Sequence, residues 1–158
     1  MVSFTRREVQ HVVWDIGTPL LNGVELPDAL RKMATMLASG AVPLELIVSG
    51  PAIALSSTYK HHLLRITQEA INNAIRHASA KRIQITLTYE ERNITLKVSD
   101  DGVGFSMVEV ADHEFGHFGL RGMHERAVKF GGALSVMSMP GGGTTVQVVA
   151  PLNPQSFS

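Results

Sequence analysis

The residues with the clearest capacity for chemistry are Glu69, Asn73 and His77, which follow one another at intervals of four residues. This spacing places the three side chains on one face if the segment is helical. A carboxylate, an amide and an imidazole in one row can activate a water, hold a metal ion through oxygen and meet a phosphate. On spacing alone, a solvated helix face without any function explains the row equally well.

Three glycine-containing motifs follow this row along the chain: DDGVGF at 100–105, GHFGL at 116–120 and GGGTT at 141–145. Each motif alone is weak evidence, because Asp and Gly are also the ordinary residues of turns. The four blocks together predict a nucleotide site built without a P-loop, since the chain has no G-x-x-x-x-G-K-[ST]. A dinucleotide fold is also unsupported, because no G-x-G-x-x-G follows the first expected strand.

The bulk composition excludes several classes of protein. The 158 residues are 44% hydrophobic, which indicates one domain with a sizeable core. The formal net charge of 0 gives no electrostatic support to a nucleic-acid partner, so none is expected. The chain has no cysteine, which excludes disulfides, thiolate metal sites and cysteine nucleophiles. No apolar run approaches the roughly 20 residues of a membrane span, and no secretory signal is recognised.

Hydrophobic periodicity predicts an α+β fold. Helices are expected over 4–15, 28–39, 58–80 and 119–130, and strands over 44–48, 81–89, 93–99, 133–138 and 145–150. Ser57 or Thr58 is expected to cap the central helix. The polar, glycine-bounded segment 106–117 is expected to be a mobile loop. Hairpins among the late strands imply a two-layer α/β sandwich, with a mixed sheet of about five strands and three main helices on one face.

With its four blocks in this order, the chain resembles the ATP-binding domain of the GHKL superfamily, which includes histidine kinases, gyrase-type ATPases and mismatch-repair ATPases. The resemblance covers roughly residues 25–151 and implies the Bergerat-type ATP-binding fold. Three segments are most similar to one group of bacterial sensor histidine kinases: RITQEA at 65–70, HA at 77–78 and GMHERA at 122–127. That group pairs with response regulators that carry a helix-turn-helix output domain.

The resemblance implies that ATP and Mg²⁺ bind around the first motif. Asn73 would bind Mg²⁺, and Glu69 would accept a proton or orient a water near the γ-phosphate. His77 would approach the phosphates. Mg²⁺ suits such a site, because it prefers oxygen ligands and keeps several waters. The phosphates would be framed by residues at the hinge of the ATP lid and the start of the next helix: Gly116, Gly119 and Leu120.

The resemblance also implies how the base is held. Asp100 would accept a hydrogen bond from the adenine amino group, which gives selectivity for adenine. Gly102 and Gly104 would let the backbone pass close to the base, where a side chain would collide with it. Thr144 would help to fix the base through a water.

One part of the family pattern is missing from the chain. A phosphoacceptor histidine is not found, because His11 is the only histidine before residue 61 and lies in the unsuitable context QHVV. We therefore expect residues 1–26 to be the end of a dimerisation helix and its linker. Residues 27–152 would be the ATP-binding domain, and 153–158 a frayed tail. Such a fragment should bind ATP without autophosphorylating alone.

The resemblance implies a cytoplasmic catalytic domain that transfers the γ-phosphoryl group of Mg-ATP to a histidine on a dimerisation domain absent from this chain. The expected partners are that domain of the parent kinase and a response regulator, with the parent a homodimer; whether the parent is anchored in the inner membrane stays open. Two alternatives also stay open. One is a non-catalytic nucleotide-sensing module, and the other is a serine kinase or ATPase of the same superfamily.

Overall fold

The computed structural model describes residues 24–38, 42–76, 78–106 and 120–152, which form a two-layer sandwich. The helices are α2 (Leu26–Ala38), α3 (Ser57–Arg76) and α5 (Leu120–Lys129). The strands are β1 (Leu44–Ser49), β2 (Ile83–Tyr89), β3 (Asn93–Asp100), β4 (Ala133–Ser138) and β5 (Thr144–Pro151). The expected helix over 4–15, nearly all of the expected loop over 106–117 and the expected tail over 153–158 lie outside the described residues.

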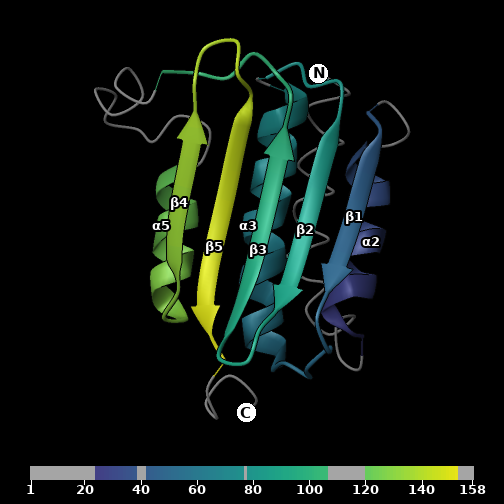
Figure 1. Cartoon of the computed structure of the whole chain (residues 1–158), viewed down its shortest axis with the longest axis vertical. Coiled ribbons are helices and arrows are strands. Elements are labelled where there is room, and N and C mark those ends of the chain that lie inside the picture. Colours follow the sequence, from purple (N-terminus) through teal and green to yellow (C-terminus); the bar gives the residue numbers. More distant parts are fainter. Residues whose placement is uncertain (1–23, 39–41, 77, 107–119, 153–158) are drawn as a thin grey trace, which may run out of the picture.

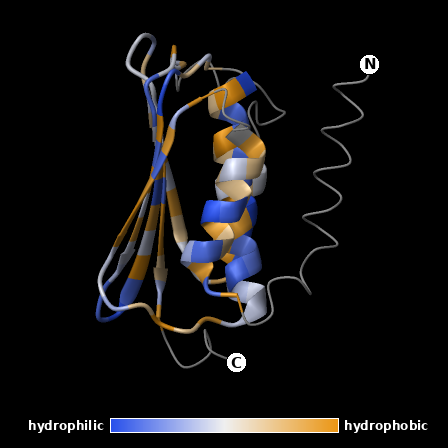
Figure 2. Cartoon of the chain, turned by 90° about the vertical axis from the view of Figure 1, so that its right-hand side faces the viewer, coloured by the Kyte–Doolittle hydropathy of each residue, from blue (hydrophilic) through white to orange (hydrophobic). Residues whose placement is uncertain are grey.

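The five strands form one mixed sheet in the order β1-β2-β3-β5-β4 (Figure 1). β1 runs parallel to β2, and the other three pairings are antiparallel. The chain passes through α3 between the two parallel strands, because a parallel pair requires a crossover connection. All three helices lie against the same face of the sheet (Figure 2). The predicted α+β class, with a five-stranded mixed sheet and three helices on one face, is confirmed.

Strand alternation decides which side chains face the helices. Ile85 of β2, Val98 of β3 and Val146 of β5 are register partners across the sheet, and all three are buried. The neighbouring positions Thr86 and Lys97 pair with each other and point to the opposite face. A sheet that is apolar on one face and polar on the other packs its helices on a single side.

The central helix α3 is long because one of its faces is almost continuously apolar. Its fully buried hydrophobic residues repeat at helical spacing and include Leu63, Ile66, Ala70, Ile71 and Ala74. The side chain that caps its first turn is Ser56, whose hydroxyl oxygen accepts the N–H of Tyr59 at 3.2 Å. The cap is therefore neither Ser57 nor Thr58, the two predicted positions, but the residue just before them. Among the described residues, no helix has both the length and the apolar character needed to cross a membrane.

The C-terminal end of α3 is where the chain turns toward the predicted site. The helix ends at Arg76, earlier than the predicted residue 80. The backbone N–H of Ala78 donates to the carbonyl of Asn73 at 3.1 Å, and Ser79 has a positive φ of 49°. The N–H of Val103 in turn donates to the carbonyl of Ala78 at 2.7 Å. The end of α3 is thus tied to the segment that follows β3.

Candidate functional site

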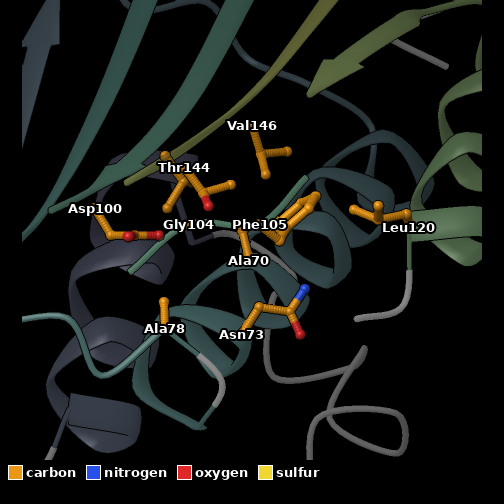
Figure 3. Close-up of a pocket in the computed structure, with 10 residues that line it drawn as sticks. Ala70, Asn73, Ala78, Asp100, Gly104, Phe105, Leu120, Thr144 and Val146 are labelled. Atoms are coloured by element: carbon orange, nitrogen blue, oxygen red, sulfur yellow. The ribbon is translucent and has the colours of Figure 1, made fainter. Parts of the chain in front are cut away.

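A pocket lies between α3 and the ends of β3 and β5 (Figure 3). It is lined by Ala70, Asn73, Ala78, Val98, Asp100, Gly104, Phe105, Leu120, Thr144 and Val146. Five of these were predicted as site residues from the sequence: Asn73, Asp100, Gly104, Leu120 and Thr144. The structure therefore brings together residues that come from α3, β3, α5 and β5 and lie far apart in the chain.

The α3 side of the pocket is polar at one position only. Asn73 lines the pocket, whereas Glu69, one helical turn earlier, does not, and both residues are partly buried. Ala70, three residues before Asn73, gives the same helix face a small apolar surface. His77 lies outside the described residues. Of the described residues in the predicted row, Asn73 therefore lines the pocket with its amide group, and the carboxylate of Glu69 lies one helical turn away.

The opposite side of the pocket carries a carboxylate and a hydroxyl. Asp100 ends β3 and pairs across the sheet with Thr144, the first residue of β5. Oδ1 of Asp100 accepts the N–H of Gly102 at 2.8 Å. Burial raises the pKa of Asp100 above its usual value, although the N–H groups of Gly102 and Thr144 stabilise the carboxylate and oppose that shift. An ionised carboxyl group here can only accept hydrogen bonds, so it suits a ligand that presents an N–H donor.

The backbone after β3 passes through a space too narrow for side chains. Gly102 is buried and does not line the pocket, and a Cβ there would collide with the carbonyl oxygen and the side chain of Ala78. Gly104 has a φ of +66°, and a Cβ there would collide with the carbonyl oxygen of Met139. The protein's own backbone therefore requires both glycines, whatever ligand the pocket takes.

Two glycines with similar backbone angles allow a direct test of this crowding. Gly141 has a φ of +79°, and a Cβ there would meet no heavy atom within 4 Å, so only the left-handed backbone opposes alanine at this position. We expect Gly141→Ala to cost about 1 kcal/mol of unfolding free energy, and Gly104→Ala to cost about 3 kcal/mol or more, because a steric collision is added. Urea denaturation of both variants measures the difference, and equal losses would contradict the crowding.

The apolar wall of the pocket was not predicted from the sequence. Phe105, Val98 and Val146 supply much of it. A signal was present, because Val98 stands two residues before Asp100 and Val146 two residues after Thr144, which places each pair on the same face of its strand. Of the predicted phosphate-framing residues, Leu120 lines the pocket at the start of α5. Gly116 and Gly119 lie outside the described residues.

Comparison with known proteins identifies the family to which the chain belongs. Residues 58–154 match the family described as "Histidine kinase-, DNA gyrase B-, and HSP90-like ATPase". The chain belongs to this ATPase family. The matched segment contains all the predicted site residues and begins with the second residue of α3. The pocket between α3, β3 and β5 is therefore the candidate ATP site of an ATPase-family domain.

Relatives within this family include several sensor proteins. The sensor protein VraS of Staphylococcus epidermidis is 33% identical over 117 residues, which are 74% of this chain and 33% of the relative. VraS of Staphylococcus saprophyticus is 34% identical over 112 residues, which are 71% of this chain and 31% of the relative. The chain thus spans about a third of the length of these curated relatives.

Solved structures of the ATPase family show the same fold. The histidine kinase domain of the blue-light activated histidine kinase of Erythrobacter litoralis EL346 aligns with a TM-score of 0.69 at 19% identity, covering 84% of this chain and 63% of that one. The ATP binding domain of PrrB from Mycobacterium tuberculosis aligns with a TM-score of 0.66 at 23% identity. The alignment covers 82% of this chain and 96% of that one. These likenesses confirm the predicted two-layer fold.

Proposed function

We propose that this chain is the ATP-binding catalytic domain of a bacterial two-component sensor histidine kinase. In the parent protein it would transfer the γ-phosphoryl group of ATP to a histidine on a dimerisation domain outside this chain. The observation that carries the proposal is the meeting of Asn73, Asp100 and Thr144 in one pocket of an ATPase-family domain. The naming of its relatives as sensor proteins supports the kinase rather than a clamp ATPase or a serine kinase.

The half of the pocket next to β3 and β5 would hold the adenine base. A flat base would contact the apolar side chains of Val98, Val146 and Ala70, and Asp100 would offer an acceptor to its exocyclic amino group. Thr144 stands beside Asp100 and supplies a second polar atom (Figure 3). This arrangement combines the two requirements of base recognition, which are apolar contact with the ring faces and polar contact at the ring edge.

The half of the pocket next to Asn73 would hold the phosphates and Mg²⁺. The described residues contain no cluster of three or more His, Cys, Asp or Glu side chains able to hold a metal by itself. An amide oxygen from Asn73 nevertheless fits Mg²⁺, which accepts few protein ligands and completes its shell with waters and phosphate oxygens. Leu120 opens α5 at the pocket, so the free N–H groups of the helix start lie near the expected phosphates.

The residues of this chain would contribute to transfer by positioning and by charge. Phosphoryl transfer involves little covalent chemistry by the protein, so alignment of the attacking and leaving atoms and stabilisation of charge dominate. Asn73 would help to hold Mg²⁺, which would neutralise charge on the phosphates. Glu69, one turn from Asn73, would accept a proton or orient a water near the γ-phosphate, and His77, Gly116 and Gly119 would meet the phosphates.

The remaining expectations concern the parent protein. Its partners would be the dimerisation domain that carries the phosphoacceptor histidine and a response regulator, and the parent would act as a homodimer in the cytoplasm. Residues 27–152 would form the catalytic domain, and residues 1–26 would connect it to the dimerisation helices.

Calorimetric titration of the purified chain with ATP, ADP and GTP, with and without Mg²⁺, tests nucleotide binding. We expect micromolar binding that prefers adenine and is strengthened by Mg²⁺. Absence of binding to a folded chain would refute the proposal. Transfer of radiolabelled phosphate from ATP to a supplied dimerisation domain then separates a kinase from a module that only binds nucleotide.

A further inference from the structure

Ser138, which the sequence did not single out, is a buried hydrogen-bond centre behind the pocket. It ends β4 and is 9% exposed. Its Oγ accepts the backbone N–H of Phe105 at 2.9 Å, donates to the carbonyl oxygen of Gly143 at 3.1 Å and lies 2.8 Å from Oγ1 of Thr144. Two of these partners, Phe105 and Thr144, line the pocket, whereas Ser138 itself does not.

The three contacts fix the direction of the Thr144 hydroxyl hydrogen. A serine hydroxyl has one hydrogen to donate and two lone pairs to accept with. The carbonyl of Gly143 can only accept, so the Ser138 hydrogen points to it, and the N–H of Phe105 can only donate, so it occupies one lone pair. All three contacts are hydrogen bonds only if Thr144 supplies the hydrogen to the remaining lone pair of Ser138.

The consequence for the pocket is that Thr144 has no hydrogen left to offer there. Its oxygen can only accept from a ligand, and the ionised carboxylate of Asp100, its register partner, can only accept as well. Two neighbouring acceptors favour a ring edge that carries an amino group and disfavour one that carries a carbonyl oxygen, because an oxygen there would face two acceptors without a hydrogen between them.

We propose that Ser138 is a positioning residue that sets base selectivity by holding the Thr144 hydrogen away from the pocket. This inference rests on the proposed nucleotide site and adds a residue outside the pocket lining that influences which base is bound. The chemical class it selects is a purine triphosphate with an amino group at ring position 6, and the class it rejects carries an oxo group there. Ser138 also anchors the backbone of Phe105, so the same hydroxyl sets one part of the apolar wall.

The test compares ATP with inosine triphosphate, which has an oxo group in place of that amino group and a hydrogen on the neighbouring ring nitrogen N1. In Ser138→Ala the Thr144 hydroxyl can rotate and donate to the oxo group. The ratio of the two affinities is therefore expected to fall about tenfold, the equivalent of about 1.4 kcal/mol. General loosening of the pocket would weaken both nucleotides and leave the ratio unchanged. Ser138→Thr keeps a hydroxyl and should restore the ratio, and Ser135→Ala on an exposed position of β4 is the matched control.

A second variant makes the result independent of how well Ser138→Ala folds. Thr144→Val removes the hydroxyl that Ser138 is inferred to orient, so it should reduce the ratio by itself. Ser138→Ala added to Thr144→Val should then change the ratio less than about twofold, as expected for residues that act through one contact. A parent chain that prefers ATP, combined with a folded Ser138→Ala or Thr144→Val that keeps the full preference, would overturn the inference. A parent chain that binds neither nucleotide would instead refute the proposed function.

Discussion

A folded Asn73→Ala variant is expected to bind Mg-ATP about 10- to 100-fold more weakly than the parent chain. Asn73 is the polar side chain that α3 contributes to the pocket lining. Alanine removes the amide oxygen that would face Mg²⁺, and neither the triphosphate nor water can restore that fixed ligand at no cost. Binding of ATP without Mg²⁺ should change much less, because the adenine end of the pocket is untouched.

The fold should survive this substitution, which makes the test clean. Asn73 is only partly buried, and alanine is the better helix former inside α3. Its neighbour Asn72 offers a matched control, because it is also partly buried on α3 but does not line the pocket. Calorimetry in Mg²⁺ and in a chelator, beside thermal unfolding of both variants, gives the result. Unchanged Mg-ATP affinity in a folded Asn73→Ala chain would rule out the assigned role.

Asp100→Asn is expected to bind ATP at least about tenfold more weakly while the free domain becomes no less stable. The amide keeps one oxygen that can accept the N–H of Gly102, although it has one acceptor oxygen fewer for the N–H groups of Gly102 and Thr144. It loses the negative charge that strengthens a hydrogen bond from the adenine amino group. Because burial disfavours the ionised carboxyl, the neutral amide also relieves an unfavourable charge in the free domain. Weaker binding with equal or higher thermal stability is the predicted pair of results.

The same carboxyl group predicts how binding and stability depend on pH. The pKa of Asp100 is raised above 3.8 in the folded state, so its ionised form lowers stability at neutral pH. That destabilisation disappears as the pH falls through the raised pKa. ATP affinity changes in the opposite sense, because protonation removes the acceptor, and should decline as the pH falls through the same range above 3.8. Calorimetry across this range should show the decline in the parent chain and not in Asp100→Asn.

Asp101 provides the control for both Asp100 experiments. The backbone N–H groups of Arg82 and Lys81 lower the pKa of this exposed carboxyl, which is the opposite direction from Asp100. Its Oδ1 accepts from Lys81 at 2.8 Å and from Arg82 at 2.9 Å, and it does not line the pocket. Asp101→Asn should therefore leave ATP affinity and its pH dependence unchanged. An equal loss of affinity in both variants would point to a general charge effect.

The helices and strands could be predicted from the sequence because hydrophobic periodicity is a local pattern. Alternation in β2 and β3 and the apolar face of α3 are readable residue by residue, and they imply which layer each element joins. The resemblance to the GHKL superfamily, carried by the order of the glycine motifs, implied that Asp100, Gly104 and Thr144 meet at one site, and the structure brings them into one pocket. Strand ends and turns can be recognised in a sequence because they favour particular residue types, such as Asp and Gly.

What the sequence did not predict depends on contacts between distant segments. Ser138 is one of many serines, and only the approach of Phe105 and Thr144 makes its hydroxyl a centre of three hydrogen bonds. The end of α3 at Arg76 likewise depends on the chain turning toward Val103. Hydrophobic periodicity cannot predict these hydrogen bonds or this helix end, because both depend on contacts with residues that are remote in the chain.

The origin of the pocket residues on α3, β3 and β5 has a consequence for folding kinetics. β3 and β5 are neighbours in the sheet but not in the chain, and Asp100 meets Thr144 only when the sheet order is complete. Contacts of this kind form late, because the loop they close must be ordered first. Partly folded chains would then have no nucleotide affinity, and ATP would stabilise the native state alone, by about 2.7 kcal/mol at a hundred times its dissociation constant. Nucleotide should therefore leave the rate of refolding almost unchanged. In a separate unfolding experiment, it should slow the unfolding of the native chain.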